Sequence, residues 1–198
     1  MGQLPMLAIV LFSVSGMFNK ISETTVEDAL GEIELLFDNE VDIKKSIEIA
    51  SYYAIFAVSN FAKIYDGGIL ERKFIERFGF FLVDAPPPCK EAIHVISISY
   101  KSGGHTRLME RLASMHEILP DLVVTKESNV FYDKGGANPI FNEVFDFCGF
   151  SVDECLVNLV ELFSGYKKVV LSIHPDDFVA AVAARVVKGG GGDGGLFR

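Results

Sequence analysis

The sequence predicts an α/β fold in which a Rossmann-like, mainly parallel sheet follows a helical N-terminal region. Residues 21–80 carry apolar side chains at helical spacing, whereas residues 93–187 alternate short apolar strands with amphipathic helices. The run Ala85-Pro86-Pro87-Pro88 lies between the two patterns, and consecutive prolines disfavour helix. Because alternating strands and helices are typical of a parallel sheet covered by helices, we place a domain boundary at this proline run.

Composition limits the classes of partner. The chain has 198 residues, of which 49% are hydrophobic, and its formal net charge is -9. We expect no nucleic-acid partner, because binding of phosphates needs clustered lysine and arginine. The three cysteines, Cys89, Cys148 and Cys155, lack the paired spacing of zinc sites and redox dithiols, so we expect reduced thiols in a cytoplasmic protein.

The apolar run at residues 4–18 is shorter than the roughly 20 residues that cross a bilayer. Its length fits the apolar part of a secretory signal, yet nothing basic precedes it and the first lysine is Lys20. We therefore expect a buried helix or strand and no stable membrane span, with secretion and membrane attachment as alternatives.

The helical region, residues 1–88, is predicted to contain three helices before the linker. Thr24 or Thr25 can cap the first. The second starts near Ile43 and stops at Gly67-Gly68, and the third covers residues 70–78 and ends at Gly79.

The Rossmann-like domain, residues 89–188, is predicted to have strands at 93–99, 121–125, 144–147 and 168–173. Ser151-Val152-Asp153-Glu154 is a capping-box pattern that opens a helix, and a last helix covers residues 178–187. The helix after the first strand is expected to bury Leu108, Leu112, Met115 and Leu119. Residues 189–198 form a glycine-rich tail, which we expect to be flexible.

The first candidate site is the glycine pair after strand 93–99. A strand, a glycine turn and a helix are how an α/β domain presents backbone N–H groups to a phosphate or sugar, which makes Gly103 and Gly104 candidate ligand contacts. Arg107 lies in the first helical turn, where a cation opposes the helix dipole, so it is also a candidate. The alternative for Arg107 is a surface ion pair with Glu110 or Glu117.

The second candidate site is His174-Pro175-Asp176-Asp177, which follows strand 168–173. A histidine beside carboxylates can act as a general base, whereas aspartates at this position can equally cap the next helix. If the two strands are neighbours, both loops open onto one crevice. We then expect His105 and His174 to be catalytic, and six residues to contact ligand: Gly103, Gly104, Thr106, Arg107, Asp176 and Asp177. His94 and His116 are interpreted as structural or surface groups.

A family resemblance supports this interpretation. Residues 102–108, Ser-Gly-Gly-His-Thr-Arg-Leu, resemble the opening glycine motif of GT-B glycosyltransferases of the group-1, GT4-like branch, and residues 169–177 resemble a later strand and loop of the same N-terminal domain. The resemblance covers about half of the chain. It implies a bacterial enzyme that transfers a sugar from a nucleotide sugar, which is a substrate, to a carbohydrate or lipid-linked acceptor, with no cofactor or metal. It also implies that a donor-binding second domain or chain completes the cleft.

Two alternatives differ in class. His174-Pro175-Asp176-Asp177 also resembles the zinc-binding opening of PIG-L/LmbE deacetylases, in which His174 and Asp177 would bind zinc and Asp176 would act as base. The other alternative is a non-catalytic or partner-dependent fragment whose helical region mediates assembly.

Overall fold

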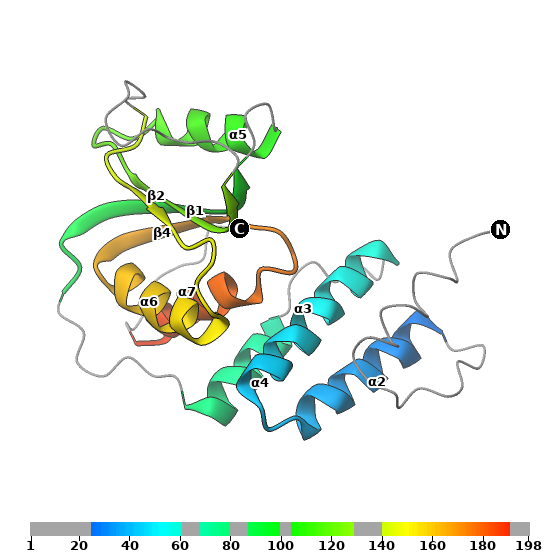
Figure 1. Cartoon of the computed structure of the whole chain (residues 1–198). Coiled ribbons are helices and arrows are strands. Elements are labelled where there is room, and N and C mark those ends of the chain that lie inside the picture. Colours follow the sequence, from blue (N-terminus) through cyan, green and yellow to red (C-terminus); the bar gives the residue numbers. More distant parts are fainter. Residues whose placement is uncertain (1–24, 61–67, 80–86, 100–103, 129–139, 191–198) are drawn as a thin grey trace.

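The computed structural model describes residues 25–60, 68–79, 87–99, 104–128 and 140–190 (Figure 1). Within these ranges an all-parallel sheet of four strands confirms the predicted Rossmann-like α/β fold. The order across the sheet is β3-β2-β1-β4. The strands are β1 (Lys90–Ser99), β2 (Asp121–Ser128), β3 (Val144–Asp146) and β4 (Tyr166–Ser172).

Helices cover both faces of the sheet. Figure 1 shows α5 (Gly104–Ala113) on one side, and α6 (Val152–Ser164) and α7 (Phe178–Gly190) on the other. Side chains alternate along β1, because successive residues of a strand point to opposite faces. Ile93 and Val95 therefore join the core under α6 and α7, whereas Ile96 packs with Met109 of α5.

The N-terminal helices α2 (Val26–Asn39), α3 (Ile43–Ser59) and α4 (Gly68–Phe78) pack beside α7 and share its core. Phe74 of α4 meets Phe178 of α7 edge to face, with ring centroids 5.5 Å apart. A second link is the ion pair of Arg185 Nη1 with Glu71 Oε2, at 2.9 Å. The two parts separated by the proline run thus have one continuous apolar core.

Local signals explain most helix ends. Thr25 caps α2 in a capping box with Asp28, and Ser151 does the same for α6 with Glu154. Gly79, directly after α4, has a φ of 66°, which favours glycine because a Cβ is strained there. The second helix ends earlier than predicted, at Ser59, where the Asn60 side chain bonds back to the Phe56 carbonyl.

The predicted buried face of α5 is correct for Leu112 and wrong for the other three residues. Met109, Leu112 and Ala113 pack against the sheet, whereas Leu108 and Leu119 are exposed and Met115 is 80% exposed. The cause is the end of the helix at Ala113, which stops the i, i+4 pattern from carrying Met115 and Leu119 onto the same face.

Some predictions fall outside the described residues. These are the apolar run at 4–18, Gly103 of the glycine pair and most of the predicted tail, of which α7 includes residues 189 and 190. In the parts that the structure describes, no helix is long and apolar enough to cross a membrane.

The amino edge of the sheet is closed by a buried carboxylate. Asp121 accepts hydrogen bonds from Lys90 Nζ and Asn142 Nδ2, both at 2.8 Å, and from the Tyr166 hydroxyl. Burial alone would raise the pKa of Asp121, but the hydrogen bonds, led by that of Lys90, hold it below its ordinary value. We interpret this edge as structural, because both oxygens of the Asp121 carboxylate accept hydrogen bonds.

Candidate functional site

The strand order places a topological switch point between β1 and β4. From β1 the chain moves through β2 to β3 on one side, and β4 then pairs with β1 on the other side. In open α/β sheets, ligands bind outside the carboxyl ends of the strands at such a point. The sequence analysis made a common crevice conditional on the two strands before the candidate loops being neighbours, and the pairing of Ile96 with Ser172 shows that they are.

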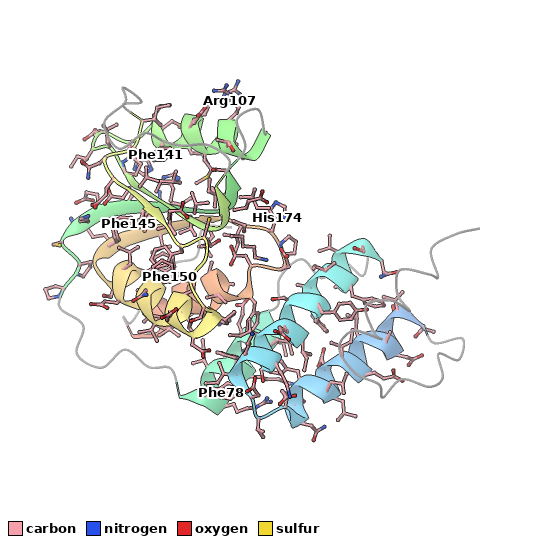
Figure 2. All side chains as sticks on the ribbon, viewed as in Figure 1. Phe78, Arg107, Phe141, Phe145, Phe150 and His174 are labelled. Atoms are coloured by element: carbon pink, nitrogen blue, oxygen red, sulfur yellow. The ribbon has the colours of Figure 1, made fainter. Side chains whose placement is uncertain are left out.

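The loop after β4, residues 174–177, is fastened to the end of β1. The backbone N–H of His174 donates to Ser97 Oγ at 2.7 Å, and Ser97 Oγ in turn donates to Asp177 Oδ2 at 2.7 Å. Ser97 is completely buried, so its hydroxyl serves as an internal link. His174, half-buried at the start of this loop, is thereby held at the switch point (Figure 2).

Asp177 has the contacts of a structural cap. It is 2% exposed and also accepts a hydrogen bond from Thr125 Oγ1 of β2. Its other oxygen, Oδ1, accepts from the backbone N–H of Ala180 at 3.4 Å, in the first turn of α7. One carboxylate therefore joins β1, β2 and α7. These contacts correspond to the capping role that the sequence left open.

Asp176 is held by a residue that the sequence analysis missed. Lys126, near the end of β2, forms an ion pair with Asp176 Oδ2 at 2.7 Å and donates to the Asp176 backbone carbonyl at 2.8 Å. About a third of each side chain is exposed, so both charges reach solvent at the carboxyl edge. The signal in the sequence was a lysine near the end of a predicted strand. Lys126 could be assigned to the site only once the strand order had placed β2 beside β1.

For the first candidate site, the structure describes only the residues from Gly104 onward. Gly104 starts α5 and Thr106 is buried in its first turn, while the His105 side chain is not among those described. Arg107 Nη1 pairs with Glu110 Oε2 at 2.8 Å, and its side chain is 65% exposed. Figure 2 shows Arg107 pointing away from the sheet, on the outer side of α5. The structure therefore brings together His174, Asp176 and Asp177, and does not bring Arg107 to them.

The deacetylase alternative can be compared with these contacts. In that family's motif Asp177 would be a zinc ligand, but here both of its oxygens are engaged by Ser97, Thr125 and Ala180. Among residues 25–60, 68–79, 87–99, 104–128 and 140–190, no group of three or more histidine, cysteine, aspartate or glutamate side chains is arranged to hold a metal ion.

Comparison with known proteins identified no similar protein. The chain matches no protein-family model, no curated protein and no solved structure. The arguments about function therefore rest on the geometry of the switch point and on the motif at residues 102–108.

Proposed function

We propose that this chain is the acceptor-side part of a nucleotide-sugar-dependent glycosyltransferase, with its substrate at the carboxyl edge of the sheet. The observation that carries the proposal is the position of His174, which Ser97 holds between the ends of β1 and β4. This is the crevice where doubly wound sheets bind ligands. Gly104 begins α5, the helix that follows β1 along the chain.

His174 is the proposed general base. As the acceptor hydroxyl oxygen forms its bond to the anomeric carbon, a ring nitrogen of His174 takes the hydroxyl proton. The bond between the anomeric carbon and the phosphate oxygen breaks, and the nucleoside diphosphate leaves with that electron pair. His105, in the first turn of α5, is the second candidate for this role.

The surrounding groups orient the substrate. The backbone at Gly103 and Gly104 and the N-terminal turn of α5 would face the negative charge of the donor. Lys126 and Asp176 offer a cation and an anion to sugar hydroxyls at the rim. Asp177 acts as a positioning residue, because its contacts fix the loop rather than meet a substrate. The remaining donor contacts would come from a second domain or a partner chain.

The test is a thermal-shift titration of the purified chain with UDP-, GDP- and ADP-sugars, run beside zinc with and without a chelator. One nucleotide sugar should raise the melting temperature; at 100 times the dissociation constant the stabilisation is about 2.7 kcal/mol. His174→Gln should lose most of this shift while remaining folded, as its circular-dichroism spectrum checks. Arg111→Ala, an exposed change on α5, is the matched control and should keep the shift.

Other outcomes contradict the proposal. Stabilisation by zinc alone would favour the deacetylase alternative. An absence of any response would favour a non-catalytic or partner-dependent fragment.

A further inference from the structure

Two histidines form a pair on the face of the sheet that α5 covers. His94 Nε2 of β1 lies 3.0 Å from His116 Nε2, three residues beyond the end of α5, and the rings meet at 81°. His94 is 1% exposed, whereas His116 is half-buried. The sequence suggested two unrelated structural or surface groups. The pair lies on the opposite face of the sheet from Ser97 and Asp177, and the proposed reaction does not use it.

The contacts determine where the proton sits. At 3.0 Å one Nε2 must donate and the other must accept, so at least one ring is neutral. Nδ1 of His94 is buried and has no hydrogen-bond partner among the described residues. A buried N–H without an acceptor is costlier than a neutral nitrogen without a donor. The geometry therefore places the His94 proton on Nε2, from which it is donated to His116.

The surroundings disfavour a charge on His94. Burial lowers its pKa to about 4, and the charges of His116 and of Lys168 on β4 act in the same direction. The residue beside it on β2, Leu122, is apolar, and the ring of Phe141 packs 6.5 Å away. No carboxylate is among these neighbours of His94, and His116, unlike His94, is only half-buried.

We propose that His94 and His116 form a pH-sensitive latch that holds residues 114–120, between α5 and β2, against the sheet. At neutral pH the His94 Nε2–H bonds to His116. A proton on His116 Nε2 places two N–H donors against each other, so the bond breaks and His116 turns toward solvent. The released segment carries the side chains of Met115, Ile118 and Leu119, which are already exposed, so opening moves this apolar surface relative to the sheet.

The test is NMR of the whole chain between pH 8 and pH 5, recording histidine ring nitrogens and backbone amides. The expected result is the Nε2–H tautomer for His94, with amides 114–119 shifting as the pH falls. In the acid limb the ratio of open to closed segment should grow tenfold per pH unit, as uptake of one proton requires. The tautomer is read from the unaltered chain and needs no variant.

Two variants separate the latch from general acid effects. In His116→Gln, the side-chain amide oxygen still accepts from His94 but does not titrate, so backbone amides 114–119 should no longer respond to pH. His174→Gln, which changes a histidine on the other face, should respond like the unaltered chain. A proton on His94 Nδ1, unchanged amides 114–119 in the unaltered chain, or the same pH response in His116→Gln would each overturn the latch.

Discussion

Replacement of Phe74 by alanine should destabilise the sheet as well as the helical region that contains Phe74. Its ring is completely buried in α4, meets Phe178 of α7 at 5.5 Å between centroids, and meets Phe78 at 4.8 Å. Deletion of a buried phenylalanine ring costs about 3–5 kcal/mol. Each aromatic pair adds about 0.5–1.5 kcal/mol beyond the area buried, which places Phe74 toward the upper part of that range.

The thiol of Cys155 in α6 reports on the α/β part. Cys155 is buried, and burial raises its pKa to about 11, so a thiol reagent reacts only after unfolding. In a background with Cys89→Ser and Cys148→Ser, the labelling rate follows the unfolding equilibrium when refolding is fast. Phe74→Ala should then accelerate labelling roughly 10²–10⁴-fold, which is the same free energy expressed as a ratio.

The matched control is Leu35→Ala on α2, whose side chain is 63% exposed and whose loss should cost less than about 0.5 kcal/mol. If Phe74→Ala reduces the helical circular-dichroism signal but leaves the Cys155 labelling rate unchanged, the two parts fold separately and the argument from a shared core is refuted.

Three further changes test individual contacts. Burial lowers the pKa of His94 from its ordinary 6.5 to about 4, so its contribution to the free energy of unfolding is present above pH 6.5 and is lost as the pH falls toward 4. This loss amounts to about 3 kcal/mol. His94→Gln should remove that part of the pH dependence of urea unfolding. Asp121→Ala removes the buried carboxylate to which Lys90, Tyr166 and Asn142 donate and should cost about 1–3 kcal/mol in the same assay, whereas no loss would show that the amino-edge cluster is not stabilising. Arg77 donates to the backbone carbonyls of Phe37 and Glu40 at the end of α2 and covers the Phe37 ring, so Arg77→Ala should lower the free energy of unfolding by about 1–3 kcal/mol in calorimetry. An equal loss in Arg77→Lys would identify the planar guanidinium as the necessary feature. No loss in either variant would show that this contact does not stabilise the fold.

Features set by neighbouring residues were predictable from sequence. The side chains of Ser151 and Glu154 each accept a hydrogen bond from the other residue's backbone N–H, so this capping box can be recognised from four consecutive residues. The strands were found because continuous apolar runs are typical of a parallel sheet buried on both faces. The end of α5 was missed, since Met115 and Leu119 continue a helical pattern that the chain does not follow beyond Ala113.

Contacts between distant residues could not be derived in the same way. Whether Asp177 caps a helix or binds a ligand depended on its contacts with Ser97 of β1 and Thr125 of β2. These residues reach Asp177 because β1 lies between β2 and β4 in the sheet. His94 and His116 are 22 residues apart, and their contact depends on where α5 stops. The sequence predicted the edge of the sheet that forms the candidate site, while the pairings within it required the fold.

The most direct test of the central claim is amide chemical-shift mapping of the chain titrated with UDP-, GDP- and ADP-sugars. The account predicts that one of them shifts amides at the carboxyl edge of the sheet, namely at residues 97–99, 104–106, 126, 172–174, 176 and 177. Shifts confined to other surfaces, or none with any nucleotide sugar, would contradict a substrate site at the switch point.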